Sequence, residues 1–541
     1  MFASLSCIKY RSIIAFAIML SSYPAIKAQK IFFSSSENVI LPEAETAIIG
    51  NVSSNTLVWE YQPQYHNSVL LVYDDRMKLK RREKINVFLS ENVYQFNFIN
   101  RKNSFSVIAQ IFSKHNFYCQ LANFNGAGEL LQPVETILST NILKNNYPGG
   151  GYEVVIADNK KYFALVKDIL NSSAKQMQLD YSLYFLQDNV KNLLQKTISI
   201  PYYQDFNITF SPMRLDNAGN LFFAEYISQN TDTGSHLIIY KSAANNSECT
   251  SSICDFTNKY LTDINIKLNN LKQQYIIYAL WYQNHRTSAA KSGTEKKGGV
   301  FSWVVNENLE SLNTDTLYTV QNFTDINLQN KYSQKTAAKD VIALTDNSYT
   351  IVLTKANSLQ DNLYAANNDG LDYNYSNLTS GPSNLFEAAS NVSYDEYNAP
   401  GYYTPNNHRN FKPKKDLPQD NINSTMSLFR INGSENKIMW SQAVNSGDDA
   451  DAFTYVSKYA LINSGETLNF ICKKILTKDK ETFVQIILDP DGNILSKPIM
   501  TNNDDYELLL DQGVQVDENS MIFPCNYRNK NLAFAKLDIS K

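Results

Sequence analysis

A short polar turn, rich in Asn and Asp and followed by an apolar strand, recurs along nearly the whole chain. Asn and Asp stabilise turns through their own side chains, and the β-branched and aromatic residues that follow them favour strands. Long segments with helical periodicity are missing. The recurrence therefore predicts an all-β chain made of repeated units. Copies of the turn lie at residues 99–105, 157–163, 215–222, 345–349, 462–468 and 516–521.

A second family of turns alternates with the first and is flanked by alternating apolar runs such as residues 483–488. These are hairpin signals. One unit therefore reads strand a, Asn/Asp turn, strand b, variable loop, strand c, second turn and strand d, which is a four-stranded antiparallel meander. Most units span roughly 50 to 60 residues. Copies of the second turn lie at residues 73–77, 124–130, 186–190, 305–309, 431–438 and 488–494.

Eight units can be counted if weaker first turns are placed at 50–52 and 269–271. The eighth unit contains strands at 514–516, 521–527 and 532–537, and the chain stops where its fourth strand should begin. An unpartnered strand near the N-terminus, at 30–33 or 38–41, could supply it. That pairing would close a ring and remove two exposed sheet edges.

With this pattern the chain resembles the β-propeller superfamily, in which the closing blade takes three strands from one terminus and one from the other. The resemblance concerns the fold alone and covers residues 29–541, which we expect to form one domain. It implies eight blades of four antiparallel strands, closed by the N-terminal strand. Seven blades with an N-terminal extension, or a pair of two-sheet sandwiches, remain alternatives.

Residues 1–28 have the features of a secretion signal. Lys9 and Arg11 precede an apolar run at 13–20, and Ala28 suits the last position before cleavage. The alternative is an N-terminal membrane anchor, although the run is short for a bilayer span. No later segment of the sequence reads as transmembrane. We expect an exported protein of the bacterial envelope, periplasmic or at the cell surface.

Five cysteines follow the signal. In an oxidising compartment Cys249 and Cys254 could close a small disulfide loop. Cys472 and Cys525 occupy corresponding strands of the last two units and could be neighbours. The formal net charge of −4 argues against general nucleic-acid binding, which needs a basic footprint.

The long insertions fall between strands b and c, so one face of the ring should be decorated and the other plain. The largest insertion spans residues 358–425 in unit six and is rich in Tyr, Asn and Pro. Tyrosines offer a flat apolar face and a hydroxyl, which suits sugar stacking or a protein interface. A poorly ordered insertion without a partner is the alternative. The candidate binding residues are Tyr364, Tyr373, Tyr375, Tyr394, Tyr397, Tyr402 and Tyr403.

Two polar clusters are candidates for a metal site: Asp448, Asp449 and Asp451 in a d–a connection, and Asp489, Asp491 and Asn493 in a hairpin turn. Calcium needs several oxygens that converge on one point, and the second cluster lacks the full spacing of a calcium loop. We expect no metal and no cofactor.

No nucleophile elbow, phosphate loop or zinc-peptidase motif occurs. A pair of channel carboxylates could still form a glycosidase, because such pairs need no local motif. The sequence therefore favours a propeller that binds a protein partner of the envelope without catalysis, and leaves enzyme activity open. The alternative is a propeller that binds or cleaves polysaccharide.

Overall fold

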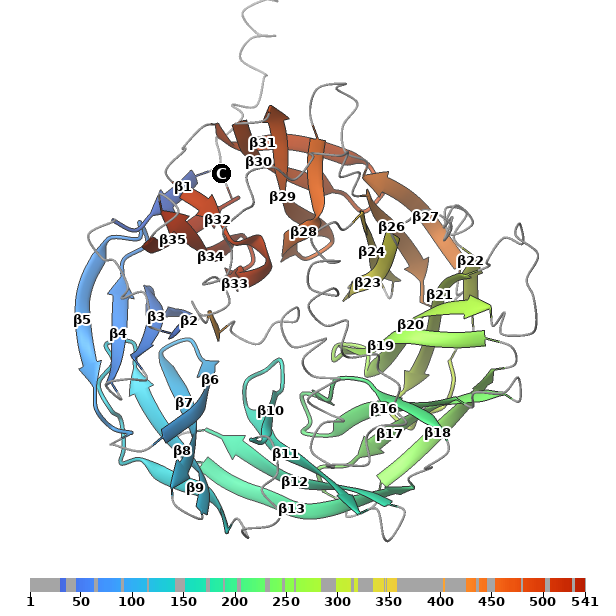
Figure 1. Cartoon of the computed structure of the whole chain (residues 1–541), viewed down its shortest axis with the longest axis horizontal. Helices are drawn as coiled ribbons and strands as arrows, with labels where there is room; N and C mark the ends of the chain where they lie inside the picture. The colour runs from blue at the N-terminus through green and yellow to red at the C-terminus, as the bar shows by residue number, and fades with distance from the viewer. Residues whose placement is uncertain are drawn as a thin grey trace, which may run out of the picture.

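The computed structural model shows a ring of β-sheets arranged around a central axis (Figure 1). The structure describes residues 30–35, 45–62, 67–88, 92–113, 116–141, 151–171, 176–187, 190–201, 206–228, 234–245, 249–256, 259–283, 298–312, 316–319, 334–344, 346, 348–357, 402–403, 425–433, 437–444, 453–477, 480–501, 506–527 and 531–540.

The first four sheets, or blades, follow each other along the chain. Blade one contains β2 (Glu45–Val52), β3 (Asn55–Gln62), β4 (Asn67–Tyr73) and β5 (Leu79–Ile85). Blade two contains β6 (Asn92–Asn100), β7 (Ser104–Ser113), β8 (Asn116–Asn125) and β9 (Glu135–Asn141). Blade three contains β10 (Glu153–Ile156), β11 (Tyr162–Asn171), β12 (Gln176–Leu186) and β13 (Val190–Pro201). In blade four the innermost strand is split, giving β14 (Asn207–Phe210), β15 (Arg214–Leu215), β16 (Leu221–Ser228), β17 (Ser235–Ser242) and β18 (Cys249–Phe256).

The remaining blades complete the ring. Blade five contains β19 (Lys259–Asn269), β20 (Gln274–Gln283), β21 (Gly298–Asn306) and β22 (Thr316–Thr319). Blade six contains β23 (Gln334–Ala343), β24 (Ser348–Asn357), β26 (Thr425–Asn432) and β27 (Lys437–Val444). Blade seven contains β28 (Phe453–Ser464), β29 (Thr467–Thr477), β30 (Lys480–Leu488) and β31 (Ile494–Thr501). Blade eight contains β32 (Tyr506–Leu508), β33 (Val514–Asp517), β34 (Ser520–Tyr527), β35 (Asn531–Asp538) and β1 (Lys30–Phe33), with the 3-10 turn η6 (Leu510–Gln512) between β32 and β33.

Each blade is an antiparallel meander, and the first strand of each blade lies nearest the axis (Figure 1). The predicted all-β propeller with eight four-stranded blades is therefore confirmed, and the alternatives of seven blades or of two sandwiches are excluded. Among the described residues the only helical element is η6.

The N-terminal strand closes the ring. β1 pairs antiparallel with β35, with Lys30 opposite Asp538 and Phe33 opposite Ala535. The ring of Phe33 also stacks on Tyr506, with centroids 4.1 Å apart. Blade eight thus combines strands from the C-terminal part of the chain with one strand, β1, from the N-terminal part. This confirms the predicted closure by residues 30–33. The other candidate strand, at 38–41, lies outside the described residues.

The hydrophobic core is divided into eight clusters, one between each pair of neighbouring blades. β16 shows how one strand serves two clusters, since successive side chains point to opposite faces of a sheet. Phe222 and Tyr226 face blade five, whereas Leu221 and Phe223 face blade three. Because both faces of a blade are buried, the middle strands are continuous apolar runs without polar alternation.

The first turn of blade one differs in detail from the sequence prediction. The turn is formed by Ser53 and Ser54, whereas Gly50 belongs to β2. Gly50 has φ +114° at a register shift in the pairing of β2 with β3, and a Cβ there would lie 2.5 Å from Nδ2 of Asn100. Gly50 therefore marks a β-bulge beside the next blade, where only glycine fits.

Candidate functional site

The connections of the ring fall on two opposite faces, because consecutive strands of a meander run in opposite directions. The a–b and c–d turns lie on one face, here called the plain face. The b–c and d–a connections lie on the other, the decorated face. In blade six the b–c connection runs from Asn357 to Thr425, so the predicted insertion leaves the ring on the decorated face.

The insertion of blade six returns to the ring at blade one. Tyr402–Tyr403 forms β25, which pairs antiparallel with the innermost strand β2, Tyr403 opposite Thr46 and Tyr402 opposite Ala47. β25 is the small brown arrow beside β2 in Figure 1. Since Thr46 and Ala47 lie at the start of β2, the insertion meets the inner edge of blade one at the decorated mouth of the channel. The other predicted binding residues lie outside the described residues: Tyr364, Tyr373, Tyr375, Tyr394 and Tyr397.

On the plain face, the recurring Asn/Asp turns bind one another. The backbone N–H of Asn159 donates to Oδ1 of Asn217 at 2.8 Å, and that of Asn217 donates to Oδ1 of Asn270 at 2.9 Å. Nδ2 of Asn270 donates in turn to Oδ2 of Asp158 at 2.7 Å. The a–b turns of blades three, four and five thus form a closed set of hydrogen bonds. The repeated Asn therefore stabilises its own turn and also forms hydrogen bonds to the turn of another blade.

The second turn family uses one geometry several times. Oδ1 of Asp489 accepts hydrogen bonds from the backbone N–H groups of Asp491 (3.0 Å) and Asn493 (2.8 Å), and Oδ2 accepts one from Nδ2 of Asn493 (2.8 Å). These bonds, above all those from Asn493, hold the pKa of the Asp489 carboxyl below its usual value. The same pair of backbone hydrogen bonds is made at Asp74, Asn125 and Asn306.

These polar residues therefore act as turn formers. Within the described residues, no group of three or more His, Cys, Asp or Glu could hold a metal ion. The other cluster tested in the sequence, Asp448, Asp449 and Asp451, lies outside them. In the same part of the chain, no helix is long and apolar enough to cross a membrane.

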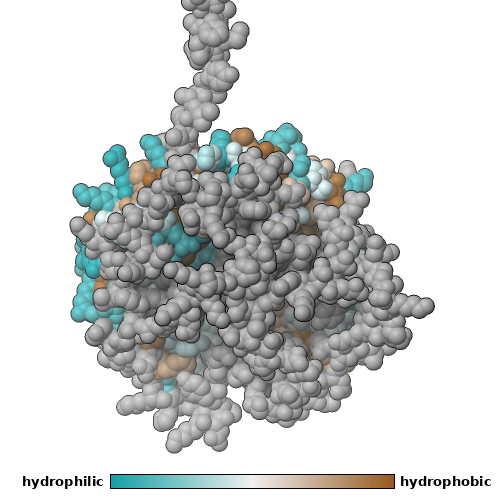
Figure 2. All heavy atoms as spheres, turned by 45° about the horizontal axis from the view of Figure 1, so that its top comes forward, coloured by the Kyte–Doolittle hydropathy of each residue, from teal (hydrophilic) through white to brown (hydrophobic). Residues whose placement is uncertain are grey.

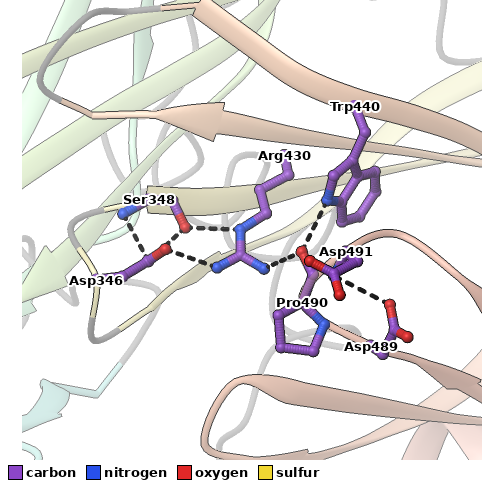
Figure 3. A network of polar contacts seen from close by, with 7 residues as sticks. All are labelled: Asp346, Ser348, Arg430, Trp440, Asp489, Pro490 and Asp491. Atoms are coloured by element: carbon purple, nitrogen blue, oxygen red, sulfur yellow. Dashed lines mark hydrogen bonds and ion pairs between the residues drawn. The ribbon is translucent and has the colours of Figure 1, made fainter.

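Arg430 joins blades six and seven on the plain face (Figure 3). This side chain is only 3% exposed. Its Nε donates to Oγ of Ser348 at 2.9 Å, one Nη to Oδ2 of Asp346 at 2.7 Å, and the other to the carbonyl oxygen of Pro490 at 2.6 Å. Nε1 of Trp440 donates to the same carbonyl at 3.1 Å. Burial raises the pKa of Asp346, but hydrogen bonds from Ser348 and Arg430 outweigh it and hold the pKa below its usual value.

Three charged residues lie on the inner strands of blades four, five and six. Arg214, Lys267 and Asp340 lie on β15, β19 and β23, and each is half-buried. Nε of Arg214 donates to the carbonyl oxygen of Ile266 at 3.2 Å, which holds the guanidinium beside Lys267. Burial raises the pKa of Asp340, while Lys267, a hydrogen bond from Val341 and Arg214 oppose it. The three charged groups therefore interact with one another across the inner strands of neighbouring blades.

Glu225 is a buried carboxyl between blades three and four. It is 1% exposed, and Oε2 accepts a hydrogen bond from the hydroxyl of Tyr240 at 2.8 Å. Oε1 is buried and finds no partner among the described residues. Burial raises the pKa of Glu225 to about 7, although the Tyr240 hydrogen bond works in the opposite direction. Glu225 is therefore a buried carboxyl that titrates close to neutral pH.

The predicted disulfide between Cys249 and Cys254 is absent, since neither residue forms a disulfide. Both lie on β18, five residues apart, where an extended strand separates their Cα atoms by about 16 Å. A disulfide needs roughly 7 Å or less. Cys254 packs between blades four and five, and Cys249 packs between blades three and four. The prediction is wrong because pairing with β17 holds residues 249–254 extended.

Cys472 and Cys525 are not neighbours either. Cys472 packs between blades six and seven, whereas Cys525 packs between blades seven and eight, so the sheet of blade seven separates them. Both are free and buried, and burial raises the pKa of each thiol.

The sequence analysis did not single out two buried charged residues of the structure, Arg430 and Glu225. Arg430 and Glu225 each lie in an apolar strand, and a lone charged residue at the centre of such a run was the available signal. Asp340, Lys267 and Arg214 could be brought together only once the inner strand of each blade was known.

The structure defines the chain as an eight-bladed β-propeller with a decorated and a plain face. No protein-family model and no curated protein matches it. The WD40 domain of SCAP from fission yeast is 8% identical, with a TM-score of 0.39 over 95% of this chain and 98% of that one. The polysaccharide lyase Uly1 is 9% identical, with a TM-score of 0.39 over 95% and 100%.

A third solved structure is the β-propeller domain of the Trilobed protease from Pyrococcus furiosus, described as having an open velcro topology. It is 7% identical, with a TM-score of 0.32 over 84% of this chain and 97% of that domain. These likenesses are too distant to carry an argument about function, and the fold assignment rests on the strand pairing of this chain.

Proposed function

We propose that this chain is a binding or scaffold propeller of the bacterial envelope, which holds a protein partner at the decorated mouth of its channel. In this role the ring supplies a stable frame. The blade-six insertion supplies the contact surface. The protein acts as an interaction subunit of a periplasmic or outer-membrane assembly.

The pairing of β25 with β2 is the observation that carries this proposal. It ties Tyr402–Tyr403 to the inner edge of blade one, although the insertion begins and ends in blade six. The pairing thus joins the described part of the insertion to a second blade, at the inner strand β2. Aromatic side chains at such a position suit a protein interface, where Tyr is enriched.

The envelope location is supported by the N-terminal segment. The expected cleavage after Ala28 falls shortly before β1, which begins at Lys30. Removal of the signal would therefore leave the closing strand intact. Mass spectrometry of the protein from a periplasmic fraction should find Gln29 as the first residue, and an uncleaved chain in the cytoplasm would contradict the proposal.

The partner is tested by purification of the tagged, full chain from native membranes. We expect one protein to co-purify at fixed stoichiometry with the wild type and to be lost from a variant lacking residues 360–420 and from the Y402A/Y403A variant. The matched control lacks residues 286–296, a part of the b–c insertion of blade five on the same face, and should keep the partner. A wild type that elutes without any partner, or a partner that survives deletion of 360–420, would overturn the proposal.

Polysaccharide binding or cleavage is a second candidate, favoured by the charged set on the inner strands. Arg214, Lys267 and Asp340 offer polar groups on blades four, five and six, and protein side chains of these kinds bind sugars. A glycan array and a product assay on the intact protein test it. Binding that is lost in an Asp340→Asn variant would support it, and silence in both assays would count against it.

A further inference from the structure

The outer edge of blade one carries a row of positive charges. Lys78 precedes β5, and Lys80, Arg82 and Lys84 lie at alternate positions along it. All four are exposed, because alternate residues of a strand point to the same side. Figure 1 places β5 on the left rim, and Figure 2 shows hydrophilic side chains gathered along that edge.

Within the described residues, none of these four side chains makes an ion pair. Nζ of Lys80 donates to the amide oxygen of Asn55 at 2.8 Å, which leaves its charge uncompensated. Glu83 lies between Arg82 and Lys84 on β5, but alternation places it on the other side of the strand, and the structure shows no ion pair between it and the row. Asp74 is engaged by the backbone N–H groups of Arg76 and Lys78 in its own turn, and Asp75 pairs with Lys536. The row is therefore a local positive surface on a chain with a net charge of −4.

Charged side chains on an outer strand can be explained without any ligand, because they prevent two sheet edges from pairing. The ring itself provides the comparison, since it has eight outer strands. β5 holds four cations, counting Arg81, whereas β13 holds two and β1, β27 and β31 hold one each. β9, β18 and β22 hold none. Edge protection therefore does not require four cations in this protein, and the row needs another explanation.

The outer edge of β5 also leaves its backbone groups unpaired by any described strand, because β5 ends its sheet. We propose that this edge binds an extended acidic segment of a partner polypeptide, which adds a fifth strand to blade one. The side chains of such a strand alternate with the same period as the row, about 6.6 Å for every second residue. Carboxylates at alternate positions would then lie about 5 Å from Lys80, Arg82 and Lys84.

A linear, peptidic ligand fits these observations better than a membrane or a polyanionic glycan. The cations form a single line along one strand, whereas a flat anionic surface would engage a two-dimensional patch. The free N–H and C=O groups of the edge can be satisfied by a peptide backbone, as in other cases of strand addition. This surface lies on the rim, away from the channel mouth, and thus goes beyond the proposed function.

The test measures binding of a fluorescent octapeptide of alternating Glu and Val to the full chain by anisotropy. At low ionic strength, where exposed charges act over a longer range, we expect K80E/R82E to bind at least about tenfold more weakly than the wild type. The same peptide with alternate N-methylated amides keeps its charges but loses donors, and it should also bind at least about tenfold more weakly. The control K191E/K196E reverses two charges on β13 and should bind like the wild type.

Three results would overturn the proposal. These are no binding of the octapeptide by the wild type, equal binding by K80E/R82E, and equal binding of the N-methylated peptide. Phosphatidylglycerol vesicles that retain the wild type but not K80E/R82E, when the peptide does not bind, would assign the row to a lipid surface. Thermal unfolding of K80E/R82E at the temperature of the wild type shows that this variant keeps the fold. If K80E/R82E unfolds earlier, the K80Q/R82Q variant is used in its place. The variant lacking 360–420 should bind the octapeptide as the wild type does. Failure of the proposed function at the channel mouth can therefore be distinguished from failure of strand addition at β5.

Discussion

The hydroxyl oxygen of Ser34 accepts a hydrogen bond from the backbone N–H of Phe534 at 3.0 Å, across 500 positions of the sequence. The backbone N–H of Ser34 returns a bond of 2.8 Å to the carbonyl oxygen of Phe534. Ser34 is only 2% exposed. The seam between β1 and β35 therefore extends one residue beyond the strand, and a buried side chain secures the closure of the ring.

Replacement of Ser34 by alanine should weaken this closure. The N–H of Phe534 would remain buried without its acceptor, which costs about 1 to 3 kcal/mol of the free energy of unfolding. Urea unfolding followed by circular dichroism measures the loss. Ser251→Ala, at an exposed position of the outer strand β18, should change stability by less than about 0.5 kcal/mol. Equal stability of both variants would show that the seam does not depend on this hydroxyl.

Removal of Arg430 should loosen the contact between blades six and seven. Arg430→Met removes three hydrogen bonds, although Trp440 still donates to the carbonyl oxygen of Pro490 and Ser348 still donates to Asp346. We expect a loss of about 3 kcal/mol in urea unfolding. Arg430→Lys should recover only part of it, because one ammonium group cannot reach three acceptors in fork geometry. A lysine variant as stable as the wild type would contradict the role of the planar guanidinium.

The sequence was sufficient to predict the repeated unit, the number of blades and their closure, because these depend on local turn chemistry and strand alternation. The Arg430 contacts could not be predicted in the same way. Their partners lie 60 and 84 positions away in sequence, and only the ring brings them together. The Cys249–Cys254 prediction failed for a related reason, since pairing with β17 holds that segment extended. Local spacing did not reveal this pairing.

Gly492 should tolerate alanine less well than Gly465. Both glycines have a positive φ, +86° and +74°, so alanine is strained at either position. A Cβ on Gly492 would lie 2.8 Å from the indole of Trp440, whereas Gly465 has nothing within 4 Å. We expect a loss of about 1 kcal/mol for Gly465→Ala and about 1 to 2 kcal/mol more for Gly492→Ala. Thermal unfolding and Trp fluorescence measure both losses. Equal losses would mean that the Trp440 side chain moves aside without loss of stability.

Glu225 should make the stability of the ring fall as the pH rises towards neutrality. Its pKa is raised from 4.5 to about 7 by burial between blades three and four. Below about pH 4.5 the carboxyl is protonated in both the folded and the unfolded chain, so it adds no pH dependence. Between these two values the unfolded chain loses the proton first, and stability declines by about 1.4 kcal/mol per pH unit. Above pH 7 the accumulated loss stays constant at about 3 kcal/mol.

The measurement is the free energy of unfolding in urea at intervals between pH 4.5 and 8. Glu225→Gln removes the titrating group, so this variant should lack that part of the decline and be the more stable protein at pH 8. Tyr240→Phe removes the hydrogen bond that favours the carboxylate, and it should move the end of the decline to higher pH. Glu518→Gln, an exposed change in a plain-face turn, should leave the profile of the wild type unaltered. A Glu225→Gln profile that coincides with that of the wild type would show that Glu225 does not titrate in this range.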